Sequence, residues 1–387
     1  MSLIDYCDNL RQREVVDLYE QGYSSRQIAD KLNSNDSSHI RRSIRRAKAR
    51  ATQNGDRPEH NMTHPLPEPH KLKRHSVNYV DGAIKQEWVI SEPDKERQLE
   101  LMREAVDALK SEIFPEKATA PPKLCNQDLA SCYVISDFHV SQLSWGEECG
   151  DEWSTSIAEN MLVDWFQSAI QSAPNSHTGI LAELGDLLHA DGVNLEAVTP
   201  ESGNILDADI RFQKLVRVVI RALRRVIALM LEKHQCVHVL LCEGNHDTAS
   251  SVWLREMFCT LYEDEPRVTV DTSPEPFYCI EWGLTSLFFH HQHKAKVADL
   301  SRVFAGKFRE IFGRTKYSYA HCGHLHHQAS KEDQLMIVEQ HSTLAARDAH
   351  SSRAGHINQR GATSITYSKE FGEVGRITVR PEMVNQG

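Results

Sequence analysis

The sequence predicts an α/β protein preceded by a small all-α domain. Two observations support this fold class. From about residue 132 onward, apolar strand-like runs alternate with helical patterns, an order typical of a sheet with crossover helices. Residues 10–51, by contrast, show helical patterns only. The chain has 387 residues, more than one domain of about 100–200 residues, so we expect a main domain with appendages.

Residues 10–51 are predicted to form a helix-turn-helix domain. The first helix is expected at about residues 11–21. Ser24 and Gln27 then form a capping box for a second helix, because each side chain can bond the backbone N–H of the other residue. A polar turn leads to a third helix that begins near residue 36 or 37.

The third helix has an apolar face, and its other faces are basic. Ile40, Ile44 and Ala47 share one face, and no acidic residue occurs between His39 and Arg50. A recognition helix has these properties, because its cations contact phosphates and base edges. We therefore expect DNA contacts from four arginines, Arg41, Arg42, Arg45 and Arg46. The alternative is a basic helical hairpin that packs on the main domain or on another protein.

The region after the helices is predicted to connect them to the main domain. Residues 52–75 are polar and contain four prolines, a composition typical of an extended linker. Residues 76–122 hold a hairpin, which turns at Asp81-Gly82, and an amphipathic helix at about residues 94–113. The main domain is predicted to occupy residues 123–387.

The main domain is predicted to alternate strands and helices and then to become rich in strands. Its first strands are expected at residues 132–136, 179–184 and 237–242. The helices are expected at residues 157–173, at residues 207–234 and from about residue 251. Two later hairpins pair residues 277–280 with 285–290 and residues 363–367 with 376–379, and a further strand is expected at residues 317–321.

Metal-binding side chains follow five of these strands. In open α/β sheets, ligands bind beyond the carboxyl ends of the strands, so we expect these side chains to meet at one edge. Mixed carboxylate and imidazole ligation without thiolate suits Mn²⁺, Fe or Zn²⁺. The side chains are Asp137 and His139, Asp186, Asn245, the histidines of residues 290–293, and His324 with His326. The nine cysteines are scattered singly, which favours free thiols over a zinc knuckle.

In their order along the chain, these motifs resemble the calcineurin-like metallophosphoesterase superfamily. The order is Asp-x-His, Gly-Asp, Gly-Asn-His-Asp, a histidine cluster and Gly-His-x-His, and it covers about residues 130–381. The resemblance implies an α/β/β/α sandwich of two mixed sheets. A helix-turn-helix, a linker and such a domain on one chain are similar to the layout of proteins of tailed phages and prophages.

The resemblance also implies two divalent metal ions, with Mn²⁺ expected and Zn²⁺, Fe or Ni²⁺ as alternatives. One ion would be held by Asp137, His139, Asp186 and His326, and the other by Asp186, Asn245, His291 and His324. Such a pair, about 3.5–4 Å apart, clamps a phosphate ester and makes a bridging hydroxide available as nucleophile at neutral pH. His246 would face the substrate, and Asp247 would fix the tautomer and orientation of His246.

Two positions depart from the superfamily pattern. His189 stands three residues after Asp186, where many members carry an aspartate, and its role is left open between a site residue and a loop histidine. Gln292 replaces a glycine in the histidine cluster, so His290 or His293 could compete with His291. We prefer His291, because this choice puts His293 in the usual place of the second histidine.

The expected function is that of a metal-dependent phosphodiesterase that cuts DNA and is delivered to it by the helix-turn-helix. One alternative is a phosphatase or cyclic-nucleotide phosphodiesterase whose helical module serves assembly, and another is a non-enzymatic DNA-binding regulator. No apolar run approaches the 18 residues of a membrane span, and residues 1–10 lack the apolar stretch of a signal peptide. We therefore expect no membrane partner and a location in the cytoplasm of a bacterial or phage-infected cell. The oligomeric state is open, and a homodimer is one alternative.

Overall fold

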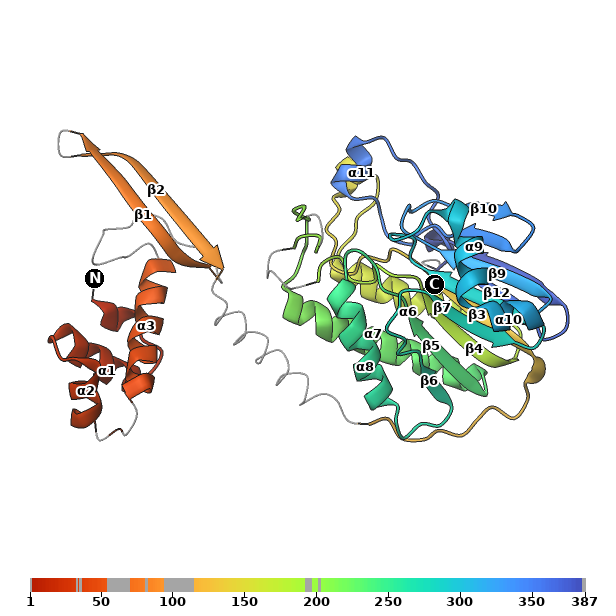
Figure 1. Ribbon diagram of the computed structural model, residues 1–387, viewed down its shortest axis with the longest axis horizontal. Helices are drawn as coiled ribbons and strands as arrows, with labels where there is room; N and C mark the ends of the chain where they lie inside the picture. Colours follow the sequence, from red (N-terminus) through yellow and green to blue (C-terminus); the bar gives the residue numbers. More distant parts are fainter. Residues whose placement is uncertain are drawn as a thin grey trace. The chain divides into compact units, whose positions relative to one another are not determined.

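The computed structural model describes residues 2–32, 34, 37–53, 70–80, 83–93, 115–191, 197–200 and 203–384. The chain divides into two compact units, residues 1–107 and residues 108–387 (Figure 1). Among the helices in the described ranges, none is long and apolar enough to cross a membrane.

The N-terminal unit contains the predicted helices. They are α1 (Leu10–Glu20), α2 (Ser25–Lys31) and α3 (Ser37–Gln53), preceded by the short 3-10 helix η1 (Leu3–Tyr6). The predicted capping box is present: the Ser24 side chain accepts from the backbone N–H of Gln27, and the Gln27 side chain accepts from that of Ser24. A small core holds the helices together, and it includes the buried residues Val15, Ile28, Ile40 and Ile44.

The hairpin of this unit is longer than predicted. Strand β1 (His70–Val80) pairs with β2 (Ala83–Pro93) in antiparallel register, from His70 opposite Pro93 to Val80 opposite Ala83. The prediction that residues 52–75 are all linker is therefore wrong at its C-terminal end. The strand begins directly after Pro69, because the residues that follow carry the N–H groups that strand pairing needs. Residues 54–69 and the predicted helix at 94–113 lie outside the described residues.

The second unit begins before the predicted boundary at residue 123. The backbone N–H of Glu116 donates to the carbonyl of Leu261 at 2.7 Å. The Thr119 backbone N–H and hydroxyl both donate to the carboxylate of Glu265, at 2.7 and 2.6 Å. Residues 115–122 are thus attached to the main domain. Their attachment depends on a few polar contacts with residues that are distant in the sequence. The periodicity of the local sequence therefore does not predict it.

The first sheet has six strands in the order β13-β12-β3-β4-β5-β6. Its parallel strands are β3 (Asn126–Ile135), β4 (Ser176–Glu183), β5 (Cys236–Leu241) and the short β6 (Val268–Val270). Helices α6 (Thr155–Ser172), α7 (Phe212–Lys233) and α8 (Thr248–Leu261) form the crossovers, as predicted. The hairpin of β12 (Ala362–Ser368) and β13 (Gly372–Val379) joins in antiparallel orientation beside β3.

The second sheet has five strands in the order β10-β11-β9-β8-β7. These are β7 (Tyr278–Trp282), β8 (Thr285–His290), β9 (Tyr317–Cys322), β10 (Ala329–Glu332) and β11 (Ile337–Gln340). Strands β8, β9 and β11 run parallel, whereas β7 and β10 are antiparallel to their neighbours, so the sheet is mixed. Helices α9 (Val297–Lys307) and α10 (Arg309–Arg314) lie between β8 and β9 in the sequence.

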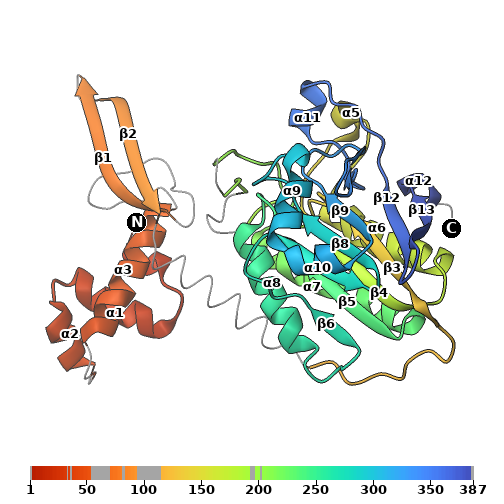
Figure 2. The ribbon, with the colours of Figure 1, turned by 45° about the vertical axis from the view of Figure 1, so that its right-hand side comes forward.

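The buried side chains separate into three layers. Together with the two sheets and the helices that cover them (Figure 2), these layers confirm the predicted α/β/β/α sandwich. Strand β3 shows why, because successive side chains of a strand point to opposite faces. Tyr133 and Ile135 pack with α6, α7 and α8, whereas Cys132 and Val134 pack between the two sheets. On the outer face of the second sheet, Phe288 packs against Leu300 and other residues of α9.

Three short helices complete the unit. They are α5 (Gly146–Cys149), α11 (Ala349–Arg353) and α12 (Pro381–Val384). Helices α5 and α11 are tied together because Glu148 accepts from the Ser352 hydroxyl at 2.7 Å and from the Arg353 side chain at 2.8 Å.

Candidate metal centre

The structure brings the predicted strand-end residues of both sheets together. Asp137 and His139 follow β3, Asp186 follows β4, and Asn245 follows β5. These three strands are parallel, so their carboxyl ends lie at one edge of the first sheet. His291 follows β8 of the second sheet, and His324 and His326 follow β9. We call the edge that these residues share the metal rim.

Two groups that consist entirely of predicted ligands form at the metal rim. In each group, the ligand atoms lie within 4.8 Å of one another. The groups are Asp137, His139 and His326, and Asp186, His291 and His324. A third group, His139, His189 and His246, shares His139 with the first.

Short distances within and between the groups bring all seven predicted ligands to one place. In the first group, His326 Nε2 lies 3.3 Å from Asp137 Oδ1. In the second, His291 Nε2 lies 3.1 Å from Asp186 Oδ2 and 3.1 Å from the side-chain oxygen of Asn245. The groups adjoin, since His291 Nε2 is also 4.0 Å from Asp137 Oδ1.

The backbone is strained where it presents these ligands. Seven non-glycine residues of the described chain have a positive φ angle, a conformation that costs L-residues about 1–2 kcal/mol each. Five of the seven are predicted ligands, Asp137, His139, Asp186, His324 and His326, with φ between 47° and 75°. Such strain persists only where surrounding contacts hold it, and it gathers at functional sites.

Hydrogen bonds hold the strained loops. The Asp137 carboxylate accepts from the Ser136 hydroxyl at 2.5 Å and from the backbone N–H of His324 at 2.8 Å. The bond to His324 ties the β3 loop to the β9 loop. Gly323 allows this approach, because a Cβ atom there would lie 1.8 Å from the Ser136 hydroxyl oxygen.

The outer nitrogens of two ligand histidines are also occupied. His291 Nδ1 donates to the carbonyl of Leu184 at 2.9 Å, so Nε2 is the nitrogen that faces Asp186. His139 Nδ1 lies 3.3 Å from Nδ1 of His189, and His139 Nε2 faces His326. Metal-binding histidines are typically oriented in this way, because the outer bond fixes the tautomer that presents a lone pair inward.

The two buried carboxylates of the centre favour the binding of cations. Asp137 and Asp186 are buried, with exposed fractions of 0% and 2%. Although burial opposes both shifts, His326 lowers the pKa of Asp137 and His291 lowers that of Asp186. Burial likewise opposes a charge on His291, yet Asp186 and Asp137 raise the pKa of this ring to about 10. Two buried carboxylates among convergent imidazoles are a donor set that suits divalent metal ions.

The predicted partnership of Asp247 with His246 is wrong. His246 Nδ1 bonds the backbone carbonyl of His189 at 2.9 Å. Asp247 is buried, and its carboxylate accepts from the backbone N–H groups of Gly244, Asp186 and Leu188 at 3.1–3.3 Å. The reason is that Asp247 precedes α8 and lies under two loops whose N–H groups need an acceptor. Asp247 therefore holds the loops that carry Asp186 and Asn245.

His189 lies behind two residues of the centre. Its ring is 2% exposed, stacks on His246 with centroids 5.5 Å apart, and meets His139 edge to face at 5.1 Å. His189 does lie in the loop after β4, and these contacts favour the alternative that it is a site residue. The sequence signal was the position of His189 three residues after Asp186, but spacing alone did not identify its two contacts.

The choice among residues 290–293 favours His291. His290 Nδ1 bonds the carbonyl of Pro276 at 2.7 Å, and its ring stacks on Phe277. His293 Nε2 lies 3.5 Å from a carboxylate oxygen of Glu243. Neither residue belongs to a ligand group in the described part of the chain.

A further set of metal-binding residue types, which sequence reasoning missed, is engaged in hydrogen bonds. His321, Glu339 and His341 are all buried in the second sheet. His321 bonds His341 at 2.9 Å through Nδ1 and the hydroxyl of Tyr367 at 2.9 Å through Nε2. Glu339 pairs with the Arg376 guanidinium. Because these groups satisfy one another, the set is a structural network.

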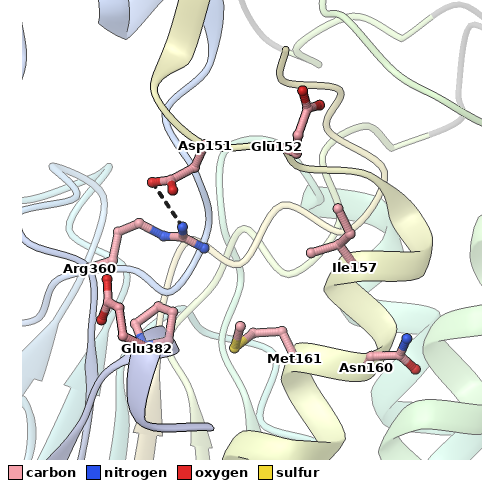
Figure 3. A pocket seen from close by; sticks show the side chains of 8 residues that line it. Asp151, Glu152, Ile157, Asn160, Met161, Arg360 and Glu382 are labelled. Carbon is pink, nitrogen blue, oxygen red and sulfur yellow. Dashed lines mark ion pairs between the residues drawn. The ribbon is translucent and has the colours of Figure 1, made fainter. Parts of the chain in front are cut away.

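A surface pocket of about 430 Å³ lies elsewhere in the main domain, and none of the predicted ligands lines it. Arg360 and Asp151 form an ion pair at 3.1 Å across one side of it (Figure 3). The Arg360 side chain is already engaged with the Leu344 carbonyl, at 2.6 and 2.9 Å. The one cation of the lining is therefore occupied by Asp151 and by the backbone.

The predicted DNA-contacting arginines lie on α3 in the N-terminal unit. Arg41, Arg42, Arg45 and Arg46 are exposed. Ile40, Ile44 and Ala47 are buried on the other side of the helix, as the sequence predicts.

No family model matches the chain, and no curated protein matches it. Several solved structures do. One is an archaeal phosphodiesterase, with 13% identity, a TM-score of 0.32, and coverage of 64% of this chain and 99% of that one. Another is a predicted phosphoesterase from Streptococcus pneumoniae, with 10% identity, a TM-score of 0.28, and coverage of 66% and 100%. A third is Vps29 complexed with Zn²⁺ from Entamoeba histolytica, with 11% identity, a TM-score of 0.27, and coverage of 65% and 99%.

Proposed function

We propose that this protein is a metal-dependent phosphodiesterase that hydrolyses DNA. The observation that carries the proposal is the meeting of the two ligand groups, with His291 Nε2 3.1 Å from Asp186 and 4.0 Å from Asp137. Asp137, His139 and His326 would hold one divalent ion, and Asn245, His291 and His324 the other. Asp186 would bridge the two ions, of which Mn²⁺ is the first candidate.

The metal ions, when bound, would supply Lewis acidity and a hydroxide nucleophile at neutral pH. The chain's own residues prepare the rest of the reaction. His246 uses its Nδ1–H to bond the His189 carbonyl, so Nε2 is the nitrogen left to face the departing oxygen. Nε2 would give a proton to that oxygen from the doubly protonated imidazolium form of the ring, which then becomes neutral. Asp247 keeps the Asp186 and Asn245 loops in place, and its role is therefore positional.

DNA is the proposed substrate because of α3. Its four exposed arginines stand on a helix without an acidic residue, in a chain whose formal net charge is -10. Such a local concentration of cations suits the phosphates of DNA, whose binding releases condensed counterions. The proposed setting is the cytoplasm, where such a substrate is present.

The test is a nuclease assay with purified full-length protein. Single- and double-stranded DNA are incubated with Mn²⁺, Zn²⁺ or no added metal, and Asp186→Asn serves as the inactive control. We expect cleavage that requires a divalent ion and disappears in the variant. If every DNA substrate stays intact while a small phosphodiester is hydrolysed, the proposal of a DNA nuclease is wrong.

A second candidate is hydrolysis of a small phosphate ester, with the helical module serving assembly. It is favoured by the acidic loop between His139 and Trp153, which carries Glu147, Glu148, Asp151 and Glu152 and would repel a polyanion. A substrate panel combined with deletion of residues 1–75 separates the two candidates. Unchanged turnover of small esters and no DNA affinity would favour this second function.

A further inference from the structure

Helix α7 of the main domain carries a concentration of cations that the proposed active site does not use. The helix has six basic residues and one acidic residue, Glu232. The basic residues are Lys214, Arg217, Arg221, Arg224, Arg225 and Lys233. In this chain Asp and Glu outnumber Lys and Arg by 54 to 44, so a helix with six basic residues and one acidic residue departs from the overall composition.

Four of these cations form one exposed row. Lys214, Arg217, Arg221 and Arg225 follow each other at intervals of three or four residues, so they share one side of the helix. All four are exposed, whereas the opposite side is buried against the first sheet. We call this row the cationic face. It extends about 16 Å along the helix, at 1.5 Å per residue.

The cationic face begins near the metal rim. Just before α7, the backbone N–H of Asp209 donates to the carbonyl of Ser141 at 3.1 Å. Ser141 is two residues after the ligand His139. Strands β4 and β5 are parallel and both run toward the rim, so α7, which connects them, runs away from it. Helix α7 (Figure 1) therefore leads away from the rim, and its exposed cations follow the same direction.

Acidic partners neutralise the helix only in part. Arg221 is held by the Glu159 carboxylate at 2.8 and 2.9 Å, and Arg224 by Glu116. An ordinary solvated helix places acidic residues at i±4 from its cations. Here no acid occurs on α7 before Glu232, so Lys214, Arg217 and Arg225 lack that intrahelical compensation.

We infer that the cationic face binds the phosphate backbone of the nucleic acid that enters the metal centre. The inference rests on the proposed nuclease function and adds a second contact, on the catalytic unit itself. A single row of cations that begins near the proposed hydrolytic centre is suited to a linear polyanion. A membrane surface is the weaker partner, because an interfacial helix inserts its apolar face into lipid, and the apolar face of α7 is buried.

The test compares two full-length triple variants. The first is Lys214→Ala, Arg217→Ala and Arg225→Ala on the cationic face. The matched control is Arg302→Ala, Arg309→Ala and Lys331→Ala, which removes three exposed cations of the same unit elsewhere. Binding of labelled single- and double-stranded DNA is measured in EDTA at several salt concentrations. Turnover of bis-p-nitrophenyl phosphate with Mn²⁺ verifies that each variant is folded.

We expect the cationic-face variant to bind DNA at least about tenfold more weakly at low salt, with the slope of log K against log salt reduced by about 2–3. Its turnover of the small ester should equal that of the native chain, and the control should keep native affinity. An unchanged slope, or an equal loss in the control, would overturn the inference. Binding of the native cationic face to phosphatidylserine vesicles but not to DNA would also overturn it.

The same experiment separates this inference from the proposed function. If the native protein cuts no DNA, yet its DNA affinity falls specifically in the cationic-face variant, the nuclease proposal fails and the binding surface stands. If DNA is cut but neither affinity nor KM for DNA changes in the variant, the nuclease proposal stands and the binding surface fails.

Discussion

At the residue scale, the metal centre depends on side chains that are placed by strained backbone. Asp137, His139 and Asp186 sit in left-handed conformations, and each has contacts that keep it there. The Asp137 carbonyl, for example, accepts from the Thr343 hydroxyl at 2.6 Å, and the His246 backbone N–H donates to Asp186 at 2.8 Å. We therefore expect metal binding at this centre to depend on individual carboxylates.

The change Asp186→Asn should remove both metal ions together. The reason is that this carboxylate is the proposed bridge, and an amide oxygen carries no charge with which to hold two cations. Metal content after gel filtration, measured by mass spectrometry, checks the prediction. Asn245→Ala is the comparison, because it should weaken one site more than the other. Full occupancy of two metals in Asp186→Asn would show that the bridging assignment is incorrect.

The change His246→Gln should keep both metals and slow turnover. General acid catalysis typically contributes about 10²–10⁴-fold, so the loss should be of this size for DNA, whose leaving oxygen needs a proton. It should be small for a nitrophenyl ester, whose leaving group departs without one. Steady-state kcat on both substrates checks this. Equal losses would instead assign His246 to the charge of the phosphoryl oxygens, and loss of a metal would make it a ligand.

At the element scale, α3 combines a buried apolar side with an exposed basic side. Changing Arg41, Arg42, Arg45 and Arg46 to Ala should weaken DNA binding and reduce the salt slope by about 1 for each phosphate that an arginine no longer neutralises. The helix should persist, because Ile40 and Ile44 still pack in the small core. Fluorescence anisotropy with labelled DNA at several salt concentrations measures the effect. An unaltered slope counts against DNA binding by α3.

Small-ester hydrolysis provides the control for α3. These arginines belong to the N-terminal unit and the ligands to the other. The quadruple variant should therefore hydrolyse bis-p-nitrophenyl phosphate at the native rate. A parallel decrease on both substrates would indicate misfolding rather than weaker binding of DNA by α3.

At the scale of the whole molecule, buried histidines couple stability to pH. His234 is fully buried, with Nδ1 bonded to the Ser176 carbonyl at 2.9 Å and Nε2 to the Tyr133 hydroxyl at 2.8 Å. Burial lowers its pKa from 6.5 to about 4. The unfolded chain thus takes up this proton near pH 6.5, whereas the folded chain takes it up only near pH 4. The contribution of His234 to stability is complete above pH 6.5 and is lost as the pH falls to about 4.

We expect the free energy of unfolding to fall by about 3 kcal/mol from this group over that interval. His234→Gln keeps a polar side chain but removes the titration, so its stability should fall less steeply between pH 6.5 and 4. Urea titrations of both proteins in EDTA, which removes the influence of metal binding, measure the difference. Parallel pH profiles of the two proteins would refute the assignment.

The sequence by itself determined the centre's donor types and the strands that carry them. Local motifs that follow apolar runs identified Asp137, His139, Asp186, Asn245, His324, His326 and the histidine cluster at residues 290–293, and strand ends of this kind meet for topological reasons. The capping box at Ser24 and the buried face of α3 were likewise predicted from local patterns, because both depend on the spacing of residues within one helix.

Only the tertiary structure decided which neighbours these residues meet. The carbonyl of His189, and not the carboxylate of Asp247, orients His246, because the chain folds back across 57 residues to make that bond. His291 rather than His290 or His293 reaches the centre, since the direction of each ring is set by partners in other elements, Leu184, Pro276 and Glu243. The basic residues of α7 can be read from the sequence. Their exposure, and the start of the row near the metal rim, depend on contacts between distant segments. Those contacts depend on how the layers pack, which no local pattern specifies.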